Sequence, residues 1–256
     1  MMERFLAVVA AICVLLAPAL VHAQESEGNL ARMWVVIPKD GMDNQLEAAM
    51  KQHNEWRKDN GDPWSWNTYH RVSGGDLNHW FIRSPGHTYA DLDAYRDSEF
   101  TKKASEHWEK YVHEYVADYG THLAEFAPEI SHTQADDPPA EYFWVYTYHI
   151  KAGQGRRFYA AAESITNELK AANWPTTWWF TWQLDGERTP AMSLVIPAPN
   201  WAGFAEPEQS AFDAVAAEKG EAAAQAMWDA MYDTVESVSS TVYRRHADLS
   251  FAAGGG

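Results

Sequence analysis

Two hydrophobic patterns alternate along the chain, and together they predict a mixed α+β fold. Short runs rich in β-branched and aromatic residues, several with strict apolar/polar alternation, predict strands near 33–37, 64–84, 121–129 and 142–149. Between them, apolar residues recur at every third or fourth position, which predicts helices such as one near 42–58. His53 lies on the apolar stripe of that helix, so we interpret it as a structural histidine.

The same series of patterns occurs twice. When residues 33–100 are shifted by 112 positions, twelve pairs are identical, including Pro63/Pro175, Trp66/Trp178 and Gly74/Gly186. Glycine, proline and tryptophan mark turns and packing positions, so these identities indicate a duplicated structural unit. We predict one unit over 24–133, a polar, proline-bearing linker over 134–140, a second unit over 141–251, and a flexible tail over 252–256.

Each unit has the predicted order β-α-β-β-α-β, which is the split βαβ or ferredoxin-like arrangement. A duplicated unit of this length resembles the dimeric α+β barrel superfamily in a tandem, single-chain form. The resemblance implies two antiparallel sheets that face each other as a barrel, with helices outside and a ligand cavity inside. The superfamily includes haem enzymes, cofactor-free monooxygenases and proteins of unknown role, so it does not select a function.

The first residues predict export. Arg4 precedes an apolar run that is too short to span a membrane stably, and Val21-His22-Ala23 ends it with a small-residue cleavage pattern. We therefore expect 1–23 to be a signal peptide and the mature protein to be periplasmic or secreted. The single cysteine, Cys13, lies within this segment, so the mature chain has no thiol for a disulfide, a metal site or nucleophilic catalysis.

The formal net charge of −16 narrows the range of partners. Such an acidic chain repels nucleic-acid phosphates and anionic lipid surfaces, and no second apolar stretch is long enough for membrane insertion after signal cleavage. We expect a small-molecule or carbohydrate-like ligand, and the sequence leaves the oligomeric state open. All thirteen tryptophans follow the signal segment, and although most should fill the core, they exceed what a core of this size usually needs.

The hairpin of residues 64–84 contains the candidate polar site. If it folds with Val72 opposite Leu77, then His70 lies opposite His79 on one face, which also presents Trp66, Phe81 and Arg83. In the second unit the equivalent face holds Trp178 and Trp182, opposite small residues. Large rings opposite small residues suit a barrel interior, so we assign these faces to the lumen.

The first strand of the second unit is expected to add an aromatic wall. Trp144, Tyr146 and Tyr148 alternate with Phe143, Val145 and Thr147, and we assign the first set to the lumen because Val145 and Thr147 suit a helix-covered side. The last strand of the first unit stays ambiguous, because either His122 or Glu125 fits an inward position.

These expectations define a binding site with a polar end. We predict that the exported barrel binds a small aromatic, hydrophobic or sugar-like ligand against its aromatic wall, oriented by His70, His79 and Arg83. The alternative is an enzyme that uses the same pocket. It is either an acid–base lyase or isomerase, with His70, His79 and Tyr146 as catalytic groups, or a haem-dependent oxidoreductase with a histidine axial ligand. No metal motif or named cofactor follows from the sequence.

Overall fold

The computed structural model of the chain describes residues 28–133, 139–186 and 188–253. The predicted signal peptide, most of the predicted linker and the end of the tail lie outside these ranges. Within the described residues the chain forms eight strands and six α-helices. The strands are β1 (Leu30–Pro38), β2 (Trp66–Ser73), β3 (Trp80–His87), β4 (Val116–His132), β5 (Tyr142–Ile150), β6 (Trp178–Gln183), β7 (Ala191–Ala198) and β8 (Val235–Phe251). The helices are α1 (Asp43–Asp59), α2 (Tyr89–Asp97), α3 (Glu99–Tyr111), α4 (Gly155–Ala171), α5 (Ala211–Lys219) and α6 (Glu221–Tyr232).

All eight strands close into one antiparallel barrel, in the order β1-β3-β2-β8-β5-β7-β6-β4. The two longest strands, β4 and β8, join the halves because each of them pairs with strands of both halves. The start of β4 pairs with β1, and its later part pairs with β6. Likewise β8 pairs first with β5 and then with β2. Closure leaves no free sheet edge along the barrel.

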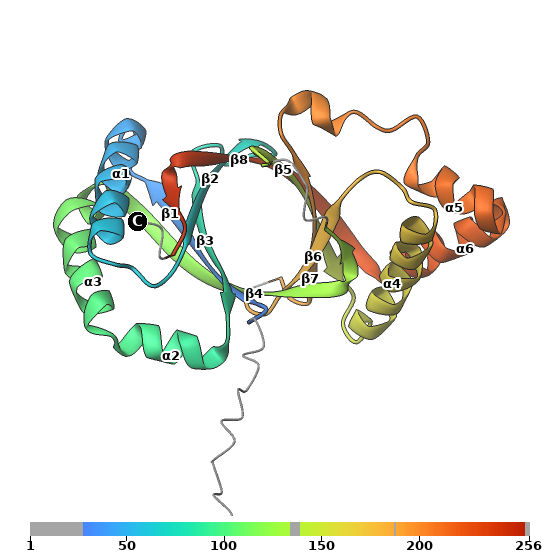
Figure 1. Cartoon of the computed structure of the whole chain (residues 1–256), viewed down its shortest axis with the longest axis horizontal. Helices are drawn as coiled ribbons and strands as arrows, with labels where there is room; N and C mark the ends of the chain where they lie inside the picture. Colours follow the sequence, from blue (N-terminus) through green and yellow to red (C-terminus); the bar gives the residue numbers. More distant parts are fainter. Residues whose placement is uncertain (1–27, 134–138, 187, 254–256) are drawn as a thin grey trace, which may run out of the picture.

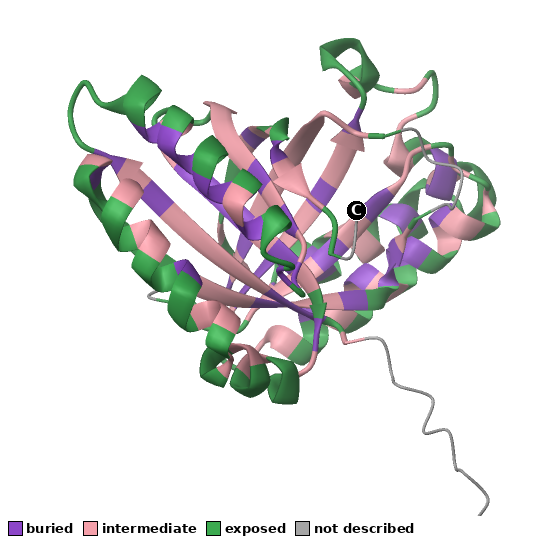
Figure 2. Cartoon of the chain, turned by 60° about the vertical axis from the view of Figure 1, so that its left-hand side comes forward, coloured by how far each residue is buried: buried purple, intermediate pink, exposed green. Residues whose placement is uncertain are grey.

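The helices form two separate layers on opposite sides of the barrel. Figure 1 shows α1, α2 and α3 on one side and α4, α5 and α6 on the other. Serine and threonine side chains begin several of these helices: Thr88 forms a capping box with Asp91, and Ser98 and Ser210 cap α3 and α5. The buried residues of the helices lie on their barrel-facing sides, as the burial colours of Figure 2 show.

Each helix layer covers its own hydrophobic core. In the C-terminal half the core contains Phe158, Ile165, Leu169 and Trp178. In the N-terminal half it contains Leu46, Met50 and three buried tryptophans, Trp64, Trp66 and Trp80. Most of the large rings therefore stabilise the contact between sheet and helices, where a full layer of side chains must be filled.

The predicted register of the first hairpin is wrong by one residue. The structure pairs His70 with Trp80 and Tyr69 with Phe81, and His79 lies outside β3, in the connection. That connection contains Gly74, Gly75 and Asp76 in succession, all with positive φ, and is longer than a two-residue turn. Because side chains alternate along a strand, a shift of one residue moves the whole predicted set of β2 to the opposite face.

The same shift applies to the second hairpin, where Trp179 pairs with Val195 and Thr181 with Ser193. Trp178, Phe180 and Trp182 therefore face the helix layer and Trp179 faces the lumen, contrary to our prediction. The assignment of β5 is also wrong, because Phe143, Val145 and Thr147 line the lumen. Tyr148 is 5% exposed and packs in the helix-side core, to which Tyr146 is adjacent.

Candidate functional site

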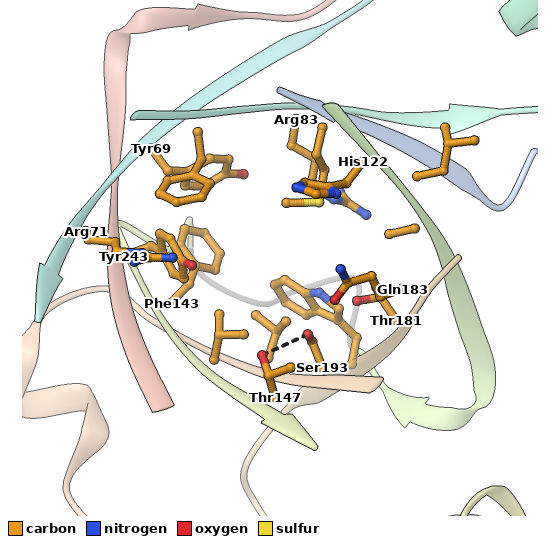
Figure 3. Close-up of a pocket in the computed structure, with 17 residues that line it drawn as sticks. Tyr69, Arg71, Arg83, His122, Phe143, Thr147, Thr181, Gln183, Ser193 and Tyr243 are labelled. Carbon is orange, nitrogen blue, oxygen red and sulfur yellow. Dashed lines mark hydrogen bonds between the residues drawn. The ribbon is translucent and has the colours of Figure 1, made fainter. Parts of the chain in front are cut away.

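The barrel encloses a cavity of about 290 Å³, to which all eight strands contribute side chains. Figure 3 shows these side chains converging from opposite walls. The cavity is lined by Met33, Tyr69, Arg71, Phe81, Arg83, His122, Leu123, Ala124, Phe143, Val145, Thr147, Trp179, Thr181, Gln183, Ser193, Val195 and Tyr243. A volume near 300 Å³ is at the small end of the range for ligand sites, so a compact molecule fits best.

Aromatic rings from both halves form one side of the cavity. Tyr69 of β2 meets Phe143 of β5 edge to face, with ring centroids 5.3 Å apart, and Phe143 lies 5.9 Å from Trp179 of β6. Phe81 and Tyr243 form a second edge-to-face pair at 5.0 Å. Rings in these arrangements present faces and edges on which a flat ligand can stack.

Arginines give the lumen its charge. Arg71 of β2 and Arg83 of β3 line the cavity, and Arg245 of β8 is paired with Tyr69, so it shares the lumen face of the barrel. None of the lining residues is Asp or Glu. Arg71 contacts Asp76 at 2.9 Å, but that carboxylate belongs to the exposed hairpin connection. The lumen is thus a local concentration of positive charge in an acidic protein.

These cations are incompletely satisfied by the protein. No hydrogen bond or ion pair to another described residue engages the guanidinium of Arg83. Within the described part of the chain, four buried side-chain nitrogens lack a partner, and three of them are on the lumen face: Arg71 Nε, Arg245 Nε and His122 Nδ1. Arginine Nε is always a donor, and a buried donor without an acceptor is costly, so the two arginine nitrogens indicate that the cavity accepts a molecule with hydrogen-bond acceptors.

Burial also changes the acidities of the groups around Arg83. Burial lowers the pKa of Arg83, although the nearby Tyr69 opposes this shift. A guanidinium nevertheless keeps its proton in proteins, so Arg83 remains a cation. Burial raises the pKa of Tyr69, and the charges of Arg83 and Arg245 oppose that shift. Tyr69 is therefore a phenol at neutral pH, able to donate a hydrogen bond into the lumen.

The sequence left open whether His122 or Glu125 of β4 faces the lumen, and the structure places His122 there. Its Nδ1 lies 3.6 Å from Asp185 Oδ1, which is longer than a hydrogen bond. Glu125, the other candidate, instead accepts a hydrogen bond from Asn29 at 2.8 Å. The sequence alone could not decide between them, because both alternating faces of this strand carry a mixture of polar and apolar residues.

The structure separates most of the predicted site residues from the lumen. Phe81 and Arg83 line the cavity. The following predicted residues lie on the helix-facing side of the barrel or in a connection: Trp66, His70, His79, Trp144, Tyr146, Tyr148, Trp178 and Trp182. His70 does have an imidazole partner, but it is His246 of β8 rather than His79. The proposed acid–base pair of His70 and His79 is therefore wrong.

Sequence reasoning missed Tyr69, Arg71, Phe143, Trp179, Tyr243 and Arg245. A signal for four of them existed, because Tyr69, Arg71, Phe143 and Trp179 belong to the alternate sets of their predicted strands. The pairing of Tyr243 and Arg245 with β2 had no comparable signal, since it depends on how far β8 continues past its own half.

The described residues offer no site for a metal ion and do not fit a haem. No group of three or more His, Cys, Asp or Glu within them could hold a metal. The cavity between the C-terminal sheet and helices, about 190 Å³, is lined by neither histidine nor cysteine. The equivalent N-terminal cavity, about 310 Å³, is lined by His53, but both ring nitrogens of His53 already have protein partners, His107 at 3.0 Å and Arg57 at 3.4 Å. His122 does border a cavity, but its ring is packed against the connection at Gly186, and the lumen behind it is small for a macrocycle.

In residues 28–133, 139–186 and 188–253, no helix combines the length and hydropathy of a membrane-spanning segment. No protein-family model and no curated protein sequence matches the chain. Solved structures do resemble it over nearly their whole length. A "putative monooxygenase" from Lactobacillus acidophilus has a TM-score of 0.54 at 9% identity, covering 88% of this chain and 96% of its own.

Two other solved structures extend this likeness. An anthrone oxidase-like protein has a TM-score of 0.56 at 11% identity, covering 90% of this chain and 95% of its own. A chlorite dismutase from Candidatus Nitrospira defluvii has a TM-score of 0.50 at 9% identity, covering 88% and 93%. At such low identities the likeness concerns the fold and not the activity. The chain therefore has the α+β barrel fold that monooxygenase-like and chlorite dismutase-like proteins share.

Proposed function

We propose that the protein binds a small, flat organic anion, such as an aromatic carboxylate, in the lumen of its barrel. One observation carries the proposal: Arg71, Arg83 and Arg245 share the lumen face without an acidic residue lining the cavity. A carboxylate would accept the unused N–H groups, and charge-assisted hydrogen bonds of this kind are stronger than neutral ones. The rings of Phe143 and Trp179 would stack on the apolar part of the ligand.

Two expectations from the sequence are kept in this proposal, and a third is changed. We infer that the barrel consists of two ferredoxin-like units, because the order of strands and helices in one half is repeated in the other. We also infer that the protein acts in the periplasm or outside the cell, since its first 23 residues have the pattern of a signal peptide. The predicted sugar-like or purely hydrophobic ligand is replaced by an anionic one on the evidence of the arginines.

An acid–base enzyme is the second candidate. His122 is the one histidine among the residues that line the described lumen, and Asp185 lies near its Nδ1. An imidazole with a carboxylate behind it is a common general base, and the arginines would hold an anionic substrate beside it. Both candidates require anion binding in the lumen, so binding is the first property to test.

The test compares 2-naphthoate with its neutral analogue 2-naphthamide by isothermal titration calorimetry. We expect the acid to bind at least tenfold more tightly than the amide, and Arg83→Met to reduce the affinity for the acid to that for the amide. Arg244→Met is the matched control, because Arg244 is next to Arg245 but exposed and paired with Glu141 at 2.7 Å. Equal affinities for acid and amide, or an Arg83→Met protein that binds the acid normally, would contradict the proposal.

A further inference from the structure

A second cavity, of about 310 Å³, lies between the N-terminal sheet and its helices. Its walls come mainly from β1, α1 and α3, with single residues from β2, β3, α2 and β4. The helices over this half leave more room than those over the other, because α1 and α3 pack together less extensively than α4 and α6. The equivalent C-terminal cavity is correspondingly smaller, at about 190 Å³.

The floor of the N-terminal cavity is polar and almost entirely satisfied from within. Arg57 is 4% exposed and donates from Nε to Asp62 Oδ2 at 2.7 Å, and it also contacts the Tyr95 hydroxyl. His53 Nδ1 lies 3.0 Å from His107 Nδ1. Burial, assisted by the charge of Arg57, lowers the pKa of His53 to about 2, so the imidazole is neutral. The floor therefore has no net charge to offer a ligand.

Trp66 is the exception in this cavity. It is 5% exposed, and its indole Nε1 is buried without a hydrogen-bond partner. Its equivalent in the other half, Trp178, donates from Nε1 to the Ile130 carbonyl at 3.0 Å. At equivalent positions, the indole N–H of Trp178 beside the smaller cavity is satisfied, and the indole N–H of Trp66 beside the larger cavity is not. Buried indole N–H groups normally find an acceptor, so an acceptor is missing here.

Aromatic side chains line the space beside this donor. Trp34 stacks on Trp66 with ring centroids 5.1 Å apart, and Trp108 of α3 borders the same cavity. Glu109 and the exposed Tyr119 lie at the opening, where a carboxylate disfavours an anion. We propose that this cavity is a second binding site, for a neutral aromatic molecule whose carbonyl or hydroxyl oxygen accepts the hydrogen bond of Trp66.

The probe for this site is 6-propionyl-2-(dimethylamino)naphthalene, a neutral naphthyl ketone whose fluorescence shifts to the blue in an apolar pocket. Titrated into the full chain, it should bind saturably, and Trp66→Phe should weaken binding about tenfold, as expected for one lost hydrogen bond. Trp178→Phe is the matched control in the other half and should change affinity less than twofold.

A second pair of variants avoids the core. Ser105 is exposed and borders the cavity, whereas its neighbour Glu106 is exposed and does not. Ser105→Trp should block the opening and abolish binding, while Glu106→Trp should leave it unchanged. Excess 2-naphthoate and Arg83→Met should not affect the ketone, which separates this site from the lumen. The proposal would be overturned if the ketone did not bind saturably, or if Trp66→Phe and Trp178→Phe had equal effects. Equal binding by the Ser105→Trp and Glu106→Trp proteins would also overturn it.

Discussion

In the N-terminal half the layer between sheet and helices contains a buried ion pair and several histidines, whereas the buried polar residues of the same layer in the C-terminal half are uncharged. The positions correspond through the 112-residue repeat: His53 and Arg57 on α1 match Ile165 and Leu169 on α4. Ile165 and Leu169 are 8% and 6% exposed and belong to a continuous core. The comparison shows that one architecture tolerates either chemistry, provided that each buried charge finds a partner.

Buried charge is expensive to maintain, and among the described residues the one buried ion pair lies in the N-terminal half. The apolar half closes its core with large side chains and a small cavity. The polar half is packed less completely and contains a larger cavity, beside which the indole N–H of Trp66 has no acceptor. Two measurements on the N-terminal layer sharpen this contrast.

The largest effect is expected from breaking the ion pair. Arg57 Nη2 lies 2.5 Å from Asp62 Oδ2, and both side chains are almost completely buried. Asp62→Ala leaves a buried guanidinium without its counter-charge, which should reduce the free energy of unfolding by about 3–5 kcal/mol in urea denaturation. The double variant Arg57→Leu/Asp62→Ala imitates Leu169 and should be more stable than Asp62→Ala alone. A double variant less stable than the single one would show that the charge is not the cause.

A smaller effect is expected from His53. Its pKa is about 2 in the folded protein and 6.5 in the unfolded chain, so below pH 6.5 the unfolded chain binds a proton that the folded protein does not. The folded protein therefore keeps its full stability with respect to His53 above pH 6.5, and its free energy of unfolding decreases as the pH falls below that value. Between pH 7 and pH 5 the loss from this residue is about 2 kcal/mol.

His53→Ile, which reproduces the residue of the other half, should flatten the dependence of unfolding free energy on pH by that amount. Burial also lowers the pKa values of His70 and His246, so the variant keeps a residual slope of the same sign. His113→Asn is the control substitution, because His113 is exposed and lies outside the buried layer between sheet and helices. If His53→Ile keeps the full slope of the original protein, His53 is not the group that titrates.

The fold class could be predicted from the sequence because the pattern of strands and helices occurs twice along the chain. The repeated Gly, Pro and Trp positions and the order of strands and helices predicted the α+β class, and the resemblance to the dimeric α+β barrel superfamily implied the barrel. The inward position of Arg83 was also predicted, because Arg83 and Phe81 share one face of β3 and Ile82, on the other face, suits contact with the helix layer. These features depend on local periodicity, which a single sequence records directly.

The faces of β2, β5 and β6 were not accessible in the same way. The face of β2 depends on how many residues the connection at Gly74, Gly75 and Asp76 takes up, and one residue reverses it. For β5 the assumption was that Val145 and Thr147 suit the helix-covered side, whereas both line the lumen. For β6 it was that Trp178 and Trp182 fill the lumen, whereas both pack in the sheet–helix layer. The contribution of β8 to the lumen follows from barrel closure, which only the assembled chain specifies.

The most direct test of the account is a crystal structure of the full chain with 4-bromobenzoate, located through the anomalous signal of bromine. The account predicts one strong bromine peak inside the barrel near Phe143 and Trp179, with the carboxylate within hydrogen-bond distance of the Arg83 guanidinium. A lumen without bromine, while the ligand occupies the N-terminal cavity or only the surface, would contradict the claim that the arginines form an anion site.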